Sequence, residues 1–349
     1  MTCWPKSNAN RQRPLGAMAA AAAALLLWPA NVAALSSLDR LSGFNVIVSP
    51  GHPYGSATAR RALASARRIG ASAVAIVPFL WQARPDDTQI GRGSDMPDDA
   101  LRMAIQDARA LGLTVIVKPH VWIPESWAGA IAPRSEIGWQ RWFAGYRGAL
   151  GRIAEIAAQE RADVLAVGTE LAKTSARGEW IDLIARVRTT FPRGLTYIAH
   201  NVEEAESVPF WPLLDAIGVS LYPPLGADRD RRGRLTTMAD IAGRLDTLAG
   251  RTGKPIIVGE IGMRSAVGAA AKPWESAEER AAAADPLLQA EVLADWLAVL
   301  HRPAVRGVLI WRWFTNPAAG GMTDTDFTVQ GKPAEGVLLC AWHVGCARR

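Results

Sequence analysis

The sequence predicts an α/β protein built as a single (β/α)8 barrel, and three observations lead to this prediction. Short apolar runs alternate with helix-like stretches, as in a series of βα units. The runs are apolar on both faces, which is typical of parallel strands covered by helices. They begin roughly twenty to fifty residues apart with no break in composition, which favours one barrel over two domains.

Eight apolar runs are strand candidates, and each precedes a helix-like stretch. The runs are residues 44–49, 73–79, 114–120, 163–170, 195–201, 216–224, 255–260 and 305–314. A doubly wound open sheet is the structural alternative, but it requires a glycine-rich phosphate turn after the first strand. The stretch "SPGHPYGSA" at 49–57 has two glycines with a different spacing. The barrel is therefore the better interpretation.

The first 34 residues predict a secretory signal peptide, which leaves 35–349 as the barrel domain. Lys6, Arg11 and Arg13 form a basic region without acids, and the apolar segment "LGAMAAAAAALLLW" follows. Small residues at 32–34 then offer a cleavage site before Leu35. The alternative is a retained membrane anchor. Cleavage predicts a secreted or periplasmic protein with no stable membrane partner.

Removal of residues 1–34 changes the charge and the cysteine count. The formal charge falls from +6 to +3 because three basic residues leave, which is too little to indicate a nucleic-acid partner. Cys3 leaves as well, so Cys340 and Cys346 remain. An even cysteine count in an exported chain predicts a disulfide between them, with two unpaired thiols as the alternative.

Two glutamates that follow predicted strands carry the main functional signal. Glu170 ends the fourth predicted strand and Glu260 ends the seventh, each shortly after a glycine. Catalytic groups of this fold lie at the carboxyl ends of strands, so both side chains are expected at one mouth. Glycoside hydrolysis needs one carboxyl group to protonate the departing oxygen and another to attack the anomeric carbon or activate water. The alternative is that either glutamate only begins a loop or caps a helix.

Polar and aromatic side chains end the other predicted strands and surround this pair. Imidazole, amide and phenol groups suit sugar hydroxyls, and a flat indole can stack on the apolar face of a pyranose. The candidate substrate-binding residues are His120, Trp122, His200, Asn201, Tyr222, Trp311 and Trp313. Trp311 and Trp313 share one face of a regular strand. The chain has 14 Trp against 7 Phe and 4 Tyr, a balance that favours carbohydrate, although several of these indoles must pack in the core.

Residues that commonly bind metals do not cluster in the sequence. His120 and His200 end different strands, with no cysteine or paired carboxylate nearby at ligand spacing. We therefore expect no metal and no cofactor.

Several segments resemble glycoside hydrolase family 113, and together they cover nearly all of residues 35–349. The motifs are "AIVPFLWQ" at 75–82, "GLTVIVKPHV" at 112–121, "GTEL" at 168–171, "LTYIAHN" at 195–201, "DAIGVSLYPPL" at 215–225, "KPIIVGEIGMRS" at 254–265 and "GKPAE" at 331–335. Their combination in this order is specific. The family belongs to the large clan of retaining (β/α)8 glycosidases, and its known members are β-mannanases.

The resemblance implies roles for individual residues. Glu170 matches the acid/base, Glu260 matches the nucleophile, and Tyr222 matches a position that hydrogen-bonds the nucleophile. The clan usually has asparagine just before the acid/base, in contact with the sugar 2-hydroxyl. Here the residue is Thr169, so either Thr169 or Asn201 is expected to make that contact.

These observations predict an exported, retaining glycoside hydrolase that uses two glutamates in a double displacement. The expected partner is an oligosaccharide or polysaccharide, most simply β-1,4-mannan or manno-oligosaccharides, and the expected state is a monomer. One alternative is a β-glucanase or an exo-glycosidase acting on another envelope or plant glycan. The other is a sugar-binding barrel without catalysis.

Overall fold

The computed structural model describes residues 40–93 and 96–343, which form a closed barrel of eight parallel strands. The barrel strands are β1 (Leu41–Ile47), β2 (Ala73–Ile76), β5 (Thr114–Val117), β7 (Val164–Thr169), β8 (Gly194–His200), β9 (Ile217–Leu221), β10 (Ile256–Ile261) and β11 (Val305–Phe314). Strand β1 pairs with both β2 and β11, which closes the barrel. The prediction of a (β/α)8 barrel is confirmed.

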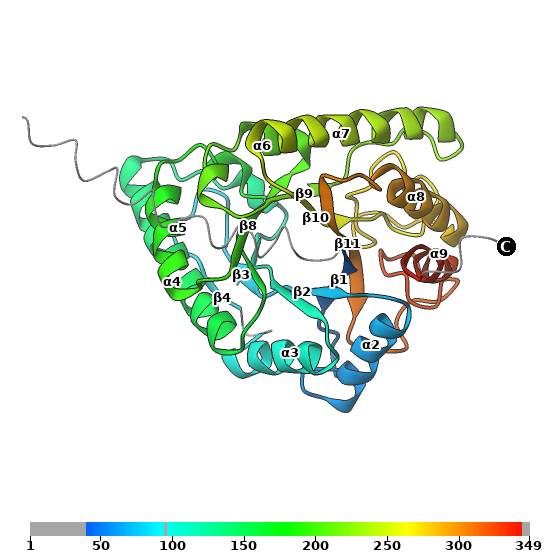
Figure 1. The fold of residues 1–349 in the computed structure, drawn as a ribbon, viewed down its shortest axis with the longest axis horizontal. Helices are drawn as coiled ribbons and strands as arrows, with labels where there is room; N and C mark the ends of the chain where they lie inside the picture. Colours follow the sequence, from blue (N-terminus) through cyan, green and yellow to red (C-terminus); the bar gives the residue numbers. More distant parts are fainter. Residues whose placement is uncertain (1–39, 94–95, 344–349) are drawn as a thin grey trace, which may run out of the picture.

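A helix follows each barrel strand, and the helices enclose the strands (Figure 1). They are α2 (Ala57–Arg68), α3 (Asp98–Ala110), α4 (Glu136–Gln159), α5 (Glu179–Thr190), α6 (Asn201–Ser207), α7 (Arg231–Thr252), α8 (Pro286–Val299) and α9 (Pro333–Trp342). Figure 1 shows α2 and α3 at the bottom, α4 and α5 at the left, α7 at the top, and α8 and α9 at the right. The strands therefore bury both faces, as their apolar sequences predict.

Local sequence signals fix where several helices begin and end. The side chains of Ser56, Ser135 and Asp285 each accept a hydrogen bond from a backbone N–H in the first turn of the following helix. Helix α7 ends at Gly253, whose φ of 67° is a left-handed conformation that glycine adopts without a Cβ clash.

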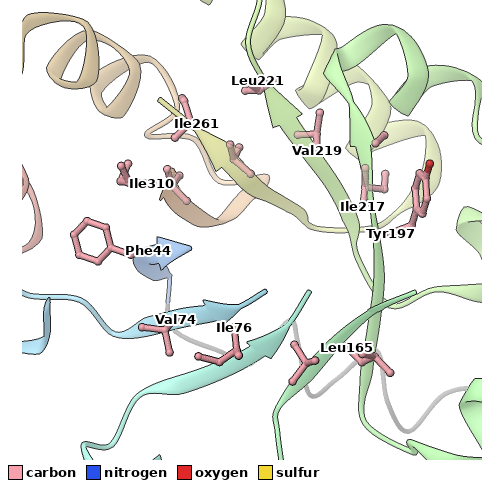
Figure 2. Packing of buried hydrophobic residues seen from close by; sticks show 14 of the residues in the cluster. Phe44, Val74, Ile76, Leu165, Tyr197, Ile217, Val219, Leu221, Ile261 and Ile310 are labelled. Carbon is pink, nitrogen blue, oxygen red and sulfur yellow. The ribbon is translucent and has the colours of Figure 1, made fainter. Parts of the chain in front are cut away.

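The core has two layers because neighbouring strand residues point to opposite sides. Val74 and Ile76 belong to the large cluster between strands and helices, part of which Figure 2 shows. Ala73 and Ala75 belong to a smaller cluster made mostly of strand residues, which fills the inside of the barrel. Alanine at two such positions keeps the interior narrow enough to be filled by side chains.

Prolines divide two of the predicted strands. Pro78 follows β2 and Pro119 follows β5, and the chain resumes as β3 (Phe79–Trp81) and β6 (His120–Trp122). These short strands pair with each other in parallel, and β4 (Gly91–Arg92) pairs antiparallel with β3. Proline has no backbone N–H, so it ends each barrel ladder there. The result is a separate three-stranded sheet at the carboxyl end of the barrel.

Two predictions fall partly or wholly outside the described ranges. The predicted signal peptide at 1–34, with Cys3, lies outside them, and so does Cys346. Cys340 lies near the exposed end of α9. Cleavage and the Cys340–Cys346 disulfide therefore stay predictions. Between residues 40 and 343, leaving aside 94–95, no helix is long and apolar enough to cross a bilayer.

The prediction that Trp311 and Trp313 share one face of their strand is wrong. Trp311 pairs with Asn45 while Trp313 pairs with the next residue, Val46, so Arg312 is an extra residue in β11. This irregularity reverses the alternation of side chains. Trp313 is 2% exposed, its Nε1 donates to the carbonyl of Ala62 at 3.0 Å, and its ring packs against Phe44. It belongs to the layer between the barrel and α2 and cannot contact a substrate at the mouth.

Trp313→Ala should therefore act on stability. Removing a fully buried indole leaves a cavity in this layer and should lower the free energy of unfolding by about 3–5 kcal/mol. Urea unfolding followed by far-UV circular dichroism measures this change. A variant as stable as the wild type, but with a raised KM for glycans, would instead support a substrate-binding role.

Candidate active site

Glu170 follows the last residue of β7 and is held there by its backbone and its side chain. Its φ of 55° is a left-handed conformation that is uncommon for residues other than glycine. Its backbone N–H donates to the carbonyl of Ile198 at 2.7 Å, which fixes the turn to β8. Oε1 lies 3.0 Å from Nδ1 of His200 and contacts the hydroxyl of Ser220. The side chain is 13% exposed, so it lies at the mouth without being in bulk water.

Glu260 lies in β10 and has different partners. The ammonium group of Lys118, a fully buried residue just after β5, contacts Oε1. The hydroxyl of Tyr222 donates to Oε2 at 3.1 Å. Both oxygens of this carboxylate therefore face a donor, and one of the donors is a cation.

Strand register brings the two glutamates together. His200 on β8 pairs with Ser220 on β9, and Ser220 pairs with Glu260 on β10. These three residues form one row across neighbouring strands. Because Ser220 also contacts Glu170, both carboxylates adjoin the same residue of the barrel rim. The structure therefore places both side chains at the same end of the barrel.

The glycine before each glutamate makes room for a neighbour. A Cβ at Gly168 would lie 3.0 Å from the ring of Tyr197, whose hydroxyl accepts a hydrogen bond from the backbone N–H of Leu171. A Cβ at Gly259 would lie 2.7 Å from Ile198. Both distances are too short for carbon atoms, so glycine allows the rim to close around the carboxylates.

Asn201 orients two of the predicted site residues. Its Oδ1 accepts a hydrogen bond from the backbone N–H of Tyr222 at 2.9 Å, which directs Nδ2 towards Nε2 of His200 at 3.2 Å. An amide nitrogen only donates, so Nε2 accepts and Nδ1 carries the hydrogen that faces Glu170. The φ of Asn201 is 56°, again left-handed. Its amide is therefore occupied by the protein.

Thr169, His120 and Trp311 also lie close to the carboxylates. Oγ1 of Thr169 is buried, and within residues 40–93 and 96–343 it has no hydrogen-bond partner. Nδ1 of His120 likewise has no hydrogen-bond partner there. Burial lowers the pKa of this imidazole, and the charges of Glu260 and Glu170 oppose that shift. The ammonium group of Lys118 lies 5.3 Å from the ring centroid of Trp311, which places that indole beside the pocket of Glu260.

Trp122 lies further out. It is 50% exposed and belongs to β6 in the three-stranded sheet, next to Phe79 and Trp81. Its exposure and its place outside the barrel wall give the mouth an outer aromatic region next to the inner polar one.

The part of the chain that the structure describes contains no group of three or more histidine, cysteine, aspartate or glutamate side chains placed to hold a metal ion. His200 contacts the carboxylate of Glu170 and the amide of Asn201, and its ring lies beside that of Trp127. The ring of His120 lies beside that of Phe79.

Comparison with known proteins identifies the family. The sequence profile of Glycoside Hydrolase Family 113 matches residues 44–332, which is most of the chain. The chain belongs to glycoside hydrolase family 113. The predictions of the family and of a glycoside hydrolase are confirmed.

Solved structures of family 113 have the same fold. One is a β-mannanase from Alicyclobacillus acidocaldarius in complex with ManMIm, with 25% identity, a TM-score of 0.79, and coverage of 88% of this chain and 98% of that one. Another is a β-1,4-mannanase in a complex, with 26% identity, a TM-score of 0.78, and coverage of 87% and 99%. A comparison with curated proteins finds no match.

A more distant likeness concerns the fold alone. A β-glucuronidase from Ruminococcus gnavus matches with 14% identity and a TM-score of 0.59, over 87% of this chain and 50% of that one. The sequence identity is too low to carry an argument about substrate.

The electrostatic environment of the acid/base candidate in this family 113 chain depends on His200. Burial would raise the pKa of Glu170, but the hydrogen bond and charge of His200, with His120 and Ser220, outweigh burial and lower that pKa to about 2. Burial lowers the pKa of His200, and its contact with Glu170 outweighs this and raises it above 6.5. Glu170 and His200 therefore titrate as a pair, and the pair takes up its next proton at a pH above the usual range of a carboxyl.

Sequence reasoning missed Lys118, Ser220 and Trp127. Lys118 directly follows an apolar strand, which is the same signal that revealed Glu170, but a lysine at a strand end is normally read as solvated. Ser220 lies inside an apolar run and gives no signal by itself. Trp127 stands alone in a loop, and only the structure brings its ring within 4.6 Å of the ring of His200.

The paired titration predicts a change in pH dependence for His200→Asn. In the wild type, kcat/KM on an oligosaccharide should fall at alkaline pH as the pair loses its proton, above 6.5. Without the imidazole, the proton is held by Glu170 alone, so the alkaline limb should move to lower pH by about one unit or more. A pH–rate profile measures the shift.

His301→Asn is the matched control. His301 contacts Arg40 at the other end of the barrel, and its substitution should leave the profile in place. An alkaline limb that stays unchanged in His200→Asn would show that the pair does not hold the catalytic proton.

Proposed function

We propose that this chain is an exported, retaining β-glycosidase that cleaves β-1,4-mannan or manno-oligosaccharides by double displacement. The main support is the contrast between the partners of the two glutamates. Glu260 faces a buried ammonium group and a phenol, which orient the two oxygens of its carboxylate. Glu170 faces a titratable imidazole, which can hold a proton next to it. Two carboxyl groups with such different surroundings suit a nucleophile and an acid/base.

In the first step, Glu260 attacks the anomeric carbon and the bond from that carbon to the leaving oxygen breaks. The proton of the Glu170–His200 pair goes to the leaving oxygen. Asn201 favours this transfer, because its Nδ2 faces Nε2 of His200 and disfavours a second ring hydrogen there. When a glycosidic oxygen lies next to Glu170, the proton therefore sits more easily on the carboxyl group of Glu170 than on His200, and from there it passes to that oxygen.

In the second step, Glu170 takes a proton from water, and the water oxygen attacks the anomeric carbon. The ester bond to Glu260 breaks and the carboxylate returns to Lys118 and Tyr222. Two inversions leave the β configuration unchanged. The hydroxyl of Thr169, buried beside Glu170, is the group we assign to a sugar hydroxyl, because the amide of Asn201 is already hydrogen-bonded.

The proposed sugar rests on relatives. Two solved family 113 structures at 25–26% identity are described as β-mannanases, and both align over nearly their whole length. Trp311, beside the pocket of Glu260, provides an indole on which a pyranose can stack. Export rests on the basic, apolar and small-residue order of residues 1–34.

The two glutamates can be separated by mutation and azide rescue. Glu260→Ala removes the nucleophile, so kcat should fall about 10⁴-fold or more on all substrates. Glu170→Ala should still release a dinitrophenolate, which needs no protonation, and should accumulate the glycosyl-enzyme. Azide should then restore turnover of Glu170→Ala and give the β-glycosyl azide, whereas Glu260→Ala should give the α-azide. NMR of the products decides the configuration, and the reverse pattern would exchange the two roles.

Export predicts a defined mature protein. Expression of the full chain in a bacterial host with a periplasm should give a product that begins at Leu35, with Cys340 and Cys346 joined. Intact mass spectrometry before and after reduction measures both, since the disulfide lowers the mass by two hydrogens. A product that keeps residues 1–34 in the membrane fraction would support the anchor alternative, and an unchanged mass on reduction would refute the disulfide.

A further inference from the structure

The sheet formed by β4, β3 and β6 has one buried face and one aromatic face. Leu80 on β3 and Val121 on β6 are buried against the core. The residues on either side of them point the other way. In the parallel register Phe79 pairs with His120 and Trp81 pairs with Trp122. We call the four rings of Phe79, Trp81, His120 and Trp122 the aromatic face.

The aromatic face is ordered from the catalytic centre outward. His120, in its inner row, follows Lys118 by two residues, and the ammonium group of Lys118 contacts Glu260. Its ring lies 6.0 Å from that of Phe79 and perpendicular to it. In the outer row, Trp81 is 43% exposed and Trp122 is 50% exposed, with ring centroids 6.2 Å apart. A molecule held at the carboxylates therefore meets these indoles if it extends in this direction.

The two outer indoles are each partly exposed to solvent. On the side of β4, Trp81 pairs with Gly91, where a Cβ would meet no atom within 4 Å. No side chain from that position can therefore cover the indole. Strand β6 also contacts β7, the strand that leads to Glu170, so the aromatic face and the acid/base are on adjoining elements.

The segment after β6 turns back to the catalytic centre. Trp127 is 43% exposed, and its ring lies 4.6 Å from that of His200, the partner of Glu170. A Cβ at Gly129 would collide with this indole, so the glycine lets Trp127 lie flat over its own loop. Aromatic surface thus borders the site from His200 round to Trp122.

We propose that the aromatic face is a glycan subsite beyond the cleavage point, where Trp81 and Trp122 hold further sugar units of the same β-linked chain that the carboxylates cleave. This inference rests on the proposed function. The chemistry favours a sugar, because two flat exposed indoles match the apolar faces of pyranoses. The subsite makes the enzyme favour long chains over short ones.

The test compares a long and a short substrate on single variants of the full mature enzyme. In Trp81→Ala and in Trp122→Ala, the loss of kcat/KM on mannohexaose should be about ten-fold larger than the loss on 2,4-dinitrophenyl β-mannoside. In the double variant, the loss on mannohexaose should be about a hundred-fold larger than the loss on the short substrate. Trp81→Phe keeps a ring and should recover most of the loss. Leu339→Ala, an exposed apolar side chain near the end of α9, is the control and should change neither substrate.

A second measurement needs no turnover. Calorimetry with mannohexaose on Glu260→Ala should give a Kd that rises about ten-fold when Trp81→Ala is added. Equal losses on the long and short substrates, or an unchanged Kd, would overturn the subsite. If the wild type cleaves cellohexaose and not mannohexaose, the proposed mannan specificity is wrong. The losses of kcat/KM in the same variants would then be measured with cellohexaose as the long substrate. If the wild type cleaves neither hexasaccharide, the proposed function is wrong. A Kd for either hexasaccharide that rises when Trp81→Ala is added would then still support the subsite, and an unchanged Kd would refute it.

Discussion

The parallel register across β8, β9 and β10 is the constraint on which the site depends. It sets His200, Ser220 and Glu260 in one row, so that an imidazole, a hydroxyl and a carboxylate from three strands lie at the same height of the barrel. Ser220 then reaches Glu170 from the middle of this row. A slip of one residue in β9 would turn Ser220 away and put an apolar neighbour against both glutamates. The geometry of the site is thus a property of the sheet, and the loops only complete it.

Within that geometry, Lys118 and Glu260 form a contact between two buried, oppositely charged side chains. Two buried charges lose their hydration, and their attraction offsets that loss only while both are present. In the proposed double displacement, Glu260 becomes an ester, so its charge disappears and the buried Lys118 loses this counter-charge. This raises the free energy of the glycosyl-enzyme relative to the free enzyme. Under that proposal, the lysine that contacts Glu260 in the free enzyme also favours hydrolysis of the intermediate, which is the second half of the reaction.

The sequence predicted the fold well because the strands carry their signal locally. Each barrel strand is a short apolar run, and the two glutamates stand out as the first charged residues after a glycine at two of these runs. What it could not predict depends on register. The place of Trp313 follows from one extra residue in β11, and the role of Ser220 follows from pairing with strands on both sides. A side-chain alternation of two residues indicates a face only as long as the ladder is regular.

Pro78 and Pro119 are a second case in which strand pairing, which the sequence pattern did not predict, shapes the site. Each appears in the sequence as part of one longer apolar run, and each in fact ends a barrel strand, because proline cannot donate to the next ladder bond. The residues that follow are then free to pair with one another and to leave the barrel wall. Without the two breaks, Trp81 and Trp122 would continue strands of a closing barrel and be covered by its neighbours. With them, the two indoles stand on a small sheet at the mouth, with one face anchored in the core by Leu80 and Val121 and the other open to solvent. The same two prolines thus end the barrel and create its aromatic border.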